Sequence, residues 1–410
     1  MKFRIFFWLM LALAAVRLLL MSITPVFEPS EARYAAISAN MARSGDFVVP
    51  RFTHDLEYQP FKGKPPLVFQ AGGICCKLFG INEFSVRLFP FCSAVLMLAV
   101  LFFFVKKRSD ADTARLSVVI CATSTAFFSA AGFSMTDMSL TCSVASALLL
   151  YGLYLENFFI GHAAGVAAFL GAGMMIKGPV ALALFGLPVV VDAIVNRHWR
   201  GVFNWRWLIV APIFLIIAVP WFVMVESRAP GSVWYFFYNE NFLRFITHDY
   251  GDNYGAGREA FRGVAIIWAI IVTLPWIALA PIRQIKWKNF ELMAILTIVG
   301  FWCLTSRVLI YYLFPVIPLF AAYMALNGNR QRLARFSCWF AGLAIVVLSS
   351  ALLGGMYFSD KMLGEKTPFV PNANHYAYEF YRGQRPESEL AEWREKRDEF
   401  FRRMREQEKK

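Results

Sequence analysis

The chain has 410 residues, of which 58% are hydrophobic and 17% aromatic, and it carries a formal net charge of +13. Length alone allows two or three soluble domains, but the apolar residues come in blocks of about 18 to 24, the length of a helix that crosses a bilayer. These blocks lack the alternation of barrel strands, and only helices or closed barrels satisfy their backbone in lipid. We therefore predict an all-α polytopic membrane protein with about 11 transmembrane helices and short interfacial helices in its outer loops.

In chain order, each apolar block predicts one span. The spans are expected near residues 5–26, 84–105, 114–133, 138–155, 161–176, 178–195, 207–225, 263–281, 289–305, 309–326 and 336–358. The first block is expected to be a retained helix rather than a signal peptide, because Arg17 interrupts it and no small-residue cleavage site follows.

Basic residues orient these spans. They cluster at Lys2/Arg4, Lys106-Lys107-Arg108, Arg197/Arg200/Arg206, Arg283/Lys286/Lys288 and Arg330/Arg332/Arg335. All five clusters fall on one side if the spans alternate, and the positive-inside rule makes that side cytoplasmic. The excess of positive charge therefore reflects topology and lipid contact, and nucleic acid is not an expected partner.

The remaining polar segments then lie on the outer face. We predict a transmembrane domain over residues 1–358 with outer loops at 27–83 and 226–262, followed by a short charged tail at 359–410. From Glu387 to Lys410 the tail carries dense charge of both signs, which is typical of a solvated or surface-lying helix or a partly disordered end. The seven cysteines lie in apolar surroundings without C-x-x-C spacing, and we expect small hydrophobes rather than disulfides or metal ligands.

The first outer loop gathers charge beside the first span. Its sequence EPSEARYAAISANMARSGDFVVPR predicts a helix that begins near Glu28-Pro29-Ser30-Glu31 and ends at Gly45. An apolar stripe of Tyr34, Ile37 and Met41 would let this helix lie flat on the interface. A second short helix is expected over 64–79, after Lys64-Pro65-Pro66.

These motifs, taken in order, resemble a known family. EPSEARY is followed by KPPLVFQAGGICCKLFGINEFSVRL, Asp137 in MTDMSL, Lys177-Gly-Pro, AVPWF, YFFYNENFLRF, GDNYG and YYLFPVIP. This series resembles the GT-C type membrane glycosyltransferases that use polyprenyl-phosphate sugars, the superfamily of the lipid A aminoarabinose transferase and the protein O-mannosyltransferases. The resemblance extends over about residues 1–330.

The resemblance implies transfer of a sugar from a polyprenyl-phosphate donor to a lipid or glycan acceptor such as lipid A, by inverting direct displacement. It also implies a multi-pass protein of the bacterial inner membrane whose active site faces the periplasm. Cations and phenols suit the departing phosphate, so donor binding is assigned to Arg33, Tyr34, Lys64 and Tyr312. Carboxylates near the anomeric carbon suit proton transfer or charge stabilisation, so catalysis is assigned to Glu31, Glu28 and Asp137, with weaker substrate roles for Asp252 and Lys177.

The chain departs from the relatives at two positions. Ser30 stands where they have the first acid of a pair, and Gly63 stands where a Glu usually precedes Lys-Pro-Pro. These changes leave open whether a divalent metal is a cofactor. They also leave three interpretations open: an altered base, an acceptor that arrives already ionised, such as a phosphate, or an inactive relative.

Simpler roles compete at each position. Glu28 and Glu31 are also suited to helix capping. Interfacial anchoring is the alternative for Arg33, Lys64 and Lys177, and a place in an aromatic belt is the alternative for Tyr312. The competing function is a transporter or flippase of lipid-linked sugars. Against it, the ionisable residues collect at the outer rim rather than at the bilayer midplane, and no repeat of the two halves is evident.

Overall fold

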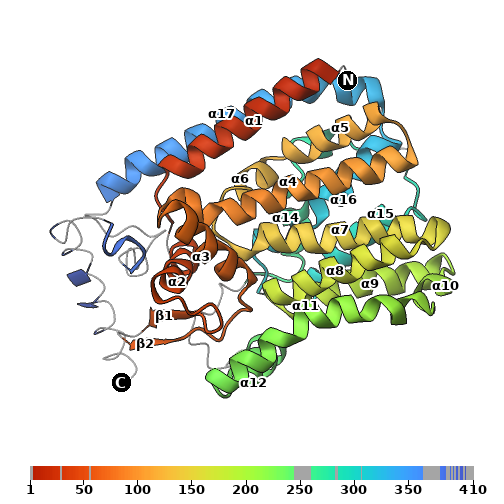
Figure 1. Cartoon of the computed structure of the whole chain (residues 1–410). Coiled ribbons are helices and arrows are strands. Elements are labelled where there is room, and N and C mark those ends of the chain that lie inside the picture. The colour runs from red at the N-terminus through yellow and green to blue at the C-terminus, as the bar shows by residue number, and fades with distance from the viewer. Residues whose placement is uncertain are drawn as a thin grey trace.

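The computed structural model describes residues 3–27, 30–54, 57–243, 260–281, 285–305, 307–362 and 379–384, and isolated positions beyond; the side chains of 54 and 352–362 are not placed. The chain forms an all-α bundle whose long helices run side by side (Figure 1). Its long helices are α1 (Phe3–Ile23), α4 (Glu83–Arg108), α7 (Thr136–Asn157), α8 (Ile160–Lys177), α11 (Arg206–Arg228) and α17 (Arg330–Met362).

Shorter helices fill the space between these. They are α5 (Ala111–Ala122), α6 (Thr125–Ala130), α9 (Pro179–Val195), α10 (Trp199–Val202), α14 (Val264–Val272), η2 (Trp276–Leu279), α15 (Phe290–Cys303), η4 (Ile310–Leu313) and α16 (Val316–Asn327). An outer layer comprises α2 (Ser30–Ser44), β1 (Arg51–His54), β2 (Glu57–Pro60), α3 (Leu67–Phe79), α12 (Ser232–Trp234) and the π-helical η1 (Tyr235–Leu243).

The prediction of a polytopic helical membrane protein is confirmed. Each of the eleven expected spans falls on a helix or on a pair of short helices. Within the described chain, six helices are long and apolar enough to cross a bilayer: α1, α4, α7, α8, α11 and the first part of α17. The other five segments are shorter or broken, as at Thr273 to Pro275 between α14 and η2, so the count of eleven stays a prediction.

Helix α7 lies at the centre of the bundle, between α4 and α8 (Figure 1). In its most apolar stretch, 89% of the residues are buried inside the protein. Helix α7 is rich in Ser, Thr, Cys, Ala and Gly, whose small side chains let neighbouring helices approach closely. Close packing of this kind holds helices together in lipid, where the hydrophobic effect does not drive their association. Since Asp137 lies in the first turn of α7, its position is fixed by the most enclosed helix.

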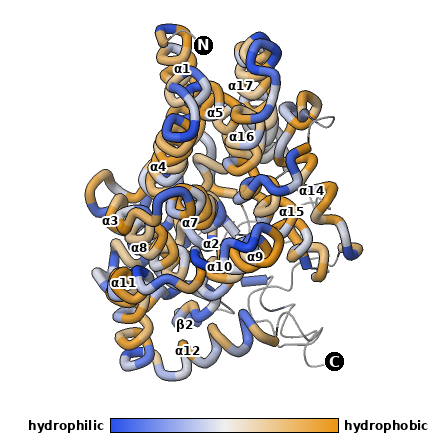
Figure 2. The backbone as a smooth tube through the Cα atoms, turned by 90° about the vertical axis from the view of Figure 1, so that its right-hand side faces the viewer, coloured by the Kyte–Doolittle hydropathy of each residue, from blue (hydrophilic) through white to orange (hydrophobic). Residues whose placement is uncertain are grey.

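The two ends of the bundle differ in character. The outer layer gathers at one end, whereas α10 and the N-terminus of α1 lie at the other (Figure 1). Figure 2, seen from that other end, shows hydrophilic connections in front of predominantly hydrophobic helices. The last turn of α4 contributes Lys106, Lys107 and Arg108 there. The motifs from the first outer loop are thus separated from the basic clusters by the length of the bundle.

Helix α2 is enclosed rather than flat on an interface. The sequence predicted one apolar stripe of Tyr34, Ile37 and Met41, but the neighbouring alanines and polar residues of α2 are buried as well. Glycines in α3 allow this contact: a Cβ on Gly72 would lie 2.7 Å from Ser38 Oγ. The stop at Gly45 is confirmed, because its φ of +74° follows the last turn of α2.

A two-stranded antiparallel hairpin follows α2, and the sequence analysis did not predict it. Arg51 pairs with Pro60 and His54 with Glu57. Each strand has only four residues, too few for a recognisable alternation of apolar and polar side chains. The hairpin carries the chain towards Lys64, and Phe52 and Phe61 pack edge to face with their ring centroids 5.3 Å apart.

Part of the tail is fixed to the outer layer. In the described piece, 379–384, the side chains of Phe380 and Tyr381 are buried. Arg43 of α2 donates hydrogen bonds to the carbonyls of Glu379, Phe380 and Arg382 at 2.7 to 3.1 Å. Residues 379–381 are therefore packed against the outer layer, whereas 382–384 are exposed.

Tyr381 ties the tail to the start of α4. Its hydroxyl donates to Glu83 Oε1 at 2.8 Å and accepts from the backbone amide of Val26 at 3.2 Å. Burial, followed by the nearby Glu83 carboxylate, raises the pKa of Tyr381 well above its usual value. The hydroxyl therefore stays protonated at neutral pH and keeps its donor role.

We expect Glu379→Ala to loosen this attachment. The Glu379 carboxylate accepts hydrogen bonds from the Asn40 side chain at 2.6 Å and from the Thr53 amide at 3.0 Å. Leaving these donors unsatisfied should accelerate hydrogen exchange at Thr53 by about 10- to 100-fold. Arg382→Ala is the control, because it removes an exposed side chain and keeps the carbonyl that Arg43 contacts. Equal exchange in both variants would contradict the attachment.

Candidate functional site

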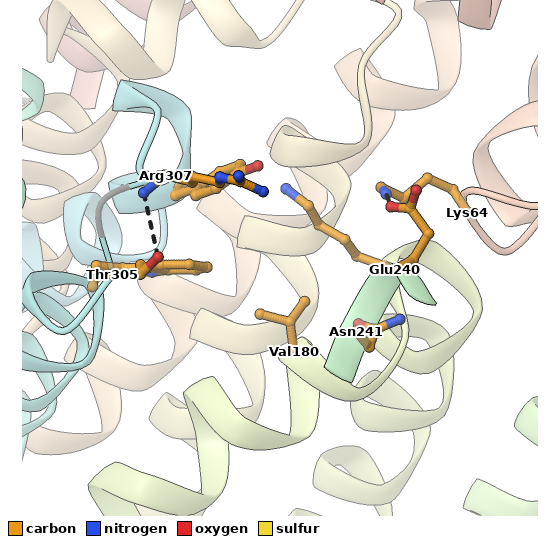
Figure 3. Close-up of a pocket in the computed structure, with 9 residues that line it drawn as sticks. Lys64, Val180, Glu240, Asn241, Thr305 and Arg307 are labelled. Atoms are coloured by element: carbon orange, nitrogen blue, oxygen red, sulfur yellow. Dashed lines mark hydrogen bonds and ion pairs between the residues drawn. The ribbon is translucent and has the colours of Figure 1, made fainter. Parts of the chain in front are cut away.

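A small pocket opens at the outer end of the bundle. Its cavity has a volume of about 60 Å³, and nine residues line it: Lys64, Lys177, Val180, Glu240, Asn241, Trp302, Thr305, Arg307 and Tyr312. They come from the approach to α3, from the turn between α8 and α9, from η1, and from the segment between α15 and η4. Figure 3 shows Arg307 and Thr305 facing Lys64 and Glu240 across the pocket. Four separate parts of the chain therefore bring three cations to one small space.

Lys177 connects the pocket to the centre of the bundle. It ends α8, and its Nζ donates to Asp137 Oδ1 at 2.6 Å. The same Nζ lies 4.3 Å from the ring centroid of Tyr312, a cation–π distance. Asp137 is buried and, unlike Lys177, is not among the residues that line the pocket. The two residues that the sequence placed in separate roles thus form one ion pair.

The turn after Lys177 requires glycine. Gly178 has a φ of +77°, and a Cβ there would lie 2.3 Å from the ring of Phe236 in η1. Only glycine combines this left-handed conformation with such close approach. The Lys-Gly-Pro motif therefore places the Lys177 ammonium beside η1 before α9 begins at Pro179.

Lys64 lies on the opposite wall. Its Nζ donates to the carbonyl of Gly63 at 2.6 Å and forms an ion pair with Glu240 Oε2 at 3.2 Å. Only 3% of the Glu240 side chain is exposed, against 16% for Lys64. Pro65 and Pro66 precede α3, so the backbone that carries Lys64 is stiff. The lysine is held at the rim while the carboxylate lies inside.

The third wall comes from the segment after α15. The Arg307 amide donates to Thr305 Oγ1 at 3.3 Å. The ring of Tyr312 lies against Trp302, with centroids 4.7 Å apart. The predicted phosphate-contact residue Tyr312 therefore does line the pocket, together with Lys64.

Arg33 and Tyr34 lie in the neighbouring aromatic cluster of α2. The Arg33 guanidinium lies 5.5 Å from the ring of Tyr34 and 5.7 Å from that of Phe61. The Tyr34 ring packs against Phe69, with their ring centroids 5.2 Å apart. Neither Arg33 nor Tyr34 is among the residues that line the pocket.

Glu31 occupies a different environment. Its carboxylate forms two hydrogen bonds with the buried guanidinium of Arg87, at 2.8 and 2.9 Å. It also accepts from the amides of Phe27 and Ser134, each at 2.9 Å. Arg87 further donates to backbone carbonyls at the end of α1. This network joins α1, α2, α4 and the start of α7 and leaves Glu31 outside the pocket lining.

Two further predicted residues, Glu28 and Asp252, lie outside the described residues. Glu240 and Arg307 line the pocket but were not assigned a role from the sequence. A signal for Glu240 was present, since it lies in the quoted motif YFFYNENFLRF; Arg307 lies just ahead of YYLFPVIP. Both residues are far from Lys64 along the chain, so the sequence does not show that they line the same pocket as Lys64.

Metal ligands do not gather in this part of the protein. Over the residues that the structure describes, no group of three or more His, Cys, Asp or Glu side chains is close enough to hold an ion. Positive charge in the pocket comes from Lys64, Lys177 and Arg307.

A shallow apolar groove lies beside the pocket. It is lined by residues of α11, α12 and η1, namely Phe222, Val223, Glu226, Ser227, Val233, Trp234 and Phe237. Because η1 contributes Phe237 to the groove and Glu240 and Asn241 to the pocket, one short helix separates the two. An open, mostly apolar groove therefore adjoins a small pocket that holds three cations.

The chain is similar to known membrane glycosyltransferases. Residues 63–224 match the family described as dolichyl-phosphate-mannose-protein mannosyltransferase. The chain is 27% identical over 361 residues to the undecaprenyl phosphate-alpha-4-amino-4-deoxy-L-arabinose arabinosyl transferase of Pectobacterium atrosepticum, covering 80% of this chain and 62% of that protein. The enzyme of the same name from Enterobacter sp. is 30% identical over 284 residues, covering 67% and 48%.

Among solved structures, ArnT from Cupriavidus metallidurans bound to undecaprenyl phosphate matches with a TM-score of 0.70 and 23% identity, over 91% of this chain and 68% of that one. The predicted resemblance to the GT-C transferases is confirmed. The chain spans less than two thirds of the two arabinosyl transferases that it matches. The fold that the chain shares with this structure brings Lys64, Lys177 and Arg307 to one pocket.

Proposed function

We propose that the chain transfers a sugar from a polyprenyl-phosphate donor to a lipid or glycan acceptor, with a lipid A-like molecule as the preferred acceptor. The observation that carries this proposal is the convergence of Lys64, Lys177 and Arg307 on one small pocket beside an apolar groove. Fixed cations at the membrane surface suit a phosphate leaving group, and the groove suits a polyprenyl chain. The arabinosyl transferases named above supply the analogy for the donor.

The proposed reaction is a direct displacement with inversion. An acceptor oxygen attacks the anomeric carbon while the bond from that carbon to the phosphate oxygen breaks. The electron pair of that bond stays on the phosphate, where Lys64, Lys177 and Arg307 stabilise the growing negative charge. Donor contact by Arg33, Tyr34 and Tyr312 is part of the proposal; of these three residues, Tyr312 lines the pocket.

The carboxylates have different proposed tasks. Asp137 holds Lys177, and Glu31 holds Arg87, so each acts through a cation rather than on the sugar itself. An acceptor phosphate is ionised at neutral pH and needs no general base, which agrees with Ser30 at the position of the relatives' first acid. Glu28 keeps its proposed role in catalysis and Asp252 its proposed role in substrate contact.

We further propose that the protein resides in the bacterial inner membrane with the pocket on the periplasmic side. Lys106, Lys107 and Arg108 end α4, at the end of the bundle opposite the outer layer (Figure 1), as the positive-inside rule requires for that orientation. A lipid-linked acceptor of the outer envelope would then approach from the same leaflet as the donor.

The test uses purified protein in nanodiscs with donors radiolabelled in the sugar and a lipid A-containing acceptor. We expect wild type to move label from the carrier to the acceptor, and Lys64→Ala to lose at least about 100-fold of this rate while remaining folded. Parallel reactions with EDTA determine whether a divalent metal takes part. Donor that crosses the bilayer of proteoliposomes without any transfer of label would instead identify a flippase.

A further inference from the structure

Arg17 is a buried cation on the membrane-spanning helix α1, and the reaction proposed above gives it no task. It lies six residues before the end of α1, about 9 Å from the outer end of that helix. Only 2% of the residue is exposed, and within the described chain its Nε and Nη1 atoms have no hydrogen-bond partner. An ionisable residue inside a spanning helix is costly, and such residues usually serve a function. Arg17 therefore requires a reason other than the stability of the fold.

The Arg17 guanidinium contacts the end of α6 and the turn at residues 131–135 that joins α6 to α7. Its Nη2 donates to the carbonyl of Ser129, in the last turn of α6, at 2.6 Å. Its carbon Cζ lies 5.3 Å from the ring centroid of Phe133, a cation–π distance. Gly132 makes room for this contact, because a Cβ on Gly132 would lie 2.5 Å from the same Cζ. Arg17 thus holds the turn from α1.

The network of Glu31 and Arg87 holds the same turn. Ser134 donates its backbone amide to Glu31 Oε1 at 2.9 Å. The Arg87 guanidinium lies 6.0 Å from the ring centroid of Phe133, the ring that Arg17 also contacts. Side chains from α1, α2 and α4 therefore fix the turn together.

Because this turn precedes α7, its position sets that of Asp137. Helix α7 begins at Thr136, two residues after Ser134, and Asp137 lies in its first turn. The Asp137 carboxylate accepts from Lys177 Nζ at 2.6 Å, and Lys177 lines the pocket. A displaced turn would move Asp137 and with it the Lys177 ammonium, and small errors of position in a reaction site reduce its rate strongly.

We propose that Arg17 is a positioning residue for sugar transfer: it holds the turn before α7 and so keeps Asp137 and Lys177 in place for the departing phosphate. The inference rests on the proposed transferase function, in which Lys177 stabilises that phosphate. It predicts a combination that a residue needed only for the fold would not give. An apolar side chain in place of Arg17 should leave the protein at least as stable, because a costly buried charge is removed, while the reaction slows.

Arg17→Met tests this combination, with undecaprenyl phosphate carrying radiolabelled 4-amino-4-deoxy-L-arabinose as the donor probe. We expect kcat to fall about 10- to 30-fold and KM to stay within about 2-fold of wild type, because the misplaced Lys177 fails chiefly to stabilise charge that grows in the transition state. The midpoint of thermal unfolding should equal or exceed that of wild type. Arg17→Lys keeps a cation that can donate to Ser129 and should bring kcat to within about 3-fold of wild type.

Gly132→Ala provides an independent variant, because the three atoms nearest to its added Cβ all belong to the Arg17 guanidinium. We expect this variant to lower kcat by about 10-fold in the wild-type background and to cause no further loss when combined with Arg17→Met. Leu13→Met is the control, since it changes a buried apolar residue one turn earlier on α1 and should leave kcat unchanged.

Hydrogen exchange measures the turn without any transfer of sugar. In Arg17→Met, amides of residues 131–137 should exchange at least about 10-fold faster than in wild type, while those of the control variant should not.

Three kinetic results would overturn the inference: an unchanged kcat in Arg17→Met, a loss of kcat that only follows a lower unfolding midpoint, or losses from Arg17→Met and Gly132→Ala that multiply in the double variant. Each of these leaves the transferase function standing. No transfer by wild type would refute that function, whereas unchanged exchange at the turn would refute the role of Arg17 whether or not sugar is transferred.

Discussion

Lys177→Met is expected to lower kcat for sugar transfer by about 100- to 1,000-fold. The substitution keeps the length of the side chain but removes an ammonium group that lines the pocket and lies over the ring of Tyr312. It also leaves the buried Asp137 carboxylate without the cation 2.6 Å from it. The measurement is single-turnover transfer of radiolabelled sugar, which separates chemistry from donor binding and product release.

The Asp137→Asn variant shows whether this loss comes from Lys177 itself or from Asp137. If Asp137 acts by positioning Lys177, Asp137→Asn should cost about 10-fold, and the double variant should be no worse than Lys177→Met alone. Lys77→Met is the control, since it removes an exposed lysine from the last turn of α3 at the same end of the bundle. A deeper loss in Asp137→Asn than in Lys177→Met would instead show that Asp137 acts directly on the reacting groups.

Glu31→Gln is expected to destabilise the fold by about 3–5 kcal/mol, because it leaves the charge of Arg87 buried without a partner. Arg87 is fully buried, and its guanidinium joins Glu31 to the carbonyls of Met21, Thr24 and Pro25. The measurement is the midpoint of thermal unfolding in detergent, with Glu57→Gln as the exposed control. The variant should unfold at a clearly lower temperature than the control.

This prediction also decides between two roles for Glu31. The sequence assigned it to catalysis, and the structure places it in the Arg87 network. A Glu31→Gln protein that is as stable as wild type but transfers no sugar would favour the catalytic role. A protein that is unstable, yet active in proportion to its folded fraction, would favour the structural one.

Much of the fold could be predicted because its signals are local. Apolar blocks of membrane length located the helices of the bundle, and the glycine at 45 located the end of α2. The enclosure of α2 could not be predicted in this way, since it depends on Gly72 and Gly73 of α3 making room for it. The same limit hid the docking of Phe380 and Tyr381, because a charged tail gives no sign that one short piece is buried.

The candidate site, too, was predicted from the sequence only in part. Lys64, Lys177 and Tyr312 were assigned from motifs, and the structure brings them to one pocket. Glu240 and Arg307 were missed because each meets Lys64 or Lys177 only through folding. Glu31 was assigned to chemistry because its partner, Arg87, lies 56 positions further along the chain. Charge in a motif thus identified the region, whereas the partner of each charge required the three-dimensional structure.

The central claim is that the pocket of Lys64, Lys177 and Arg307 holds the phosphate of a polyprenyl carrier. It is tested most directly by binding of undecaprenyl phosphate to the purified protein in nanodiscs, for wild type, Lys64→Ala, Arg307→Ala and the control Lys77→Met. We predict saturable binding that each pocket variant weakens by at least about 10-fold and the control leaves unchanged. Equal affinity in all four proteins would contradict the assignment of the pocket.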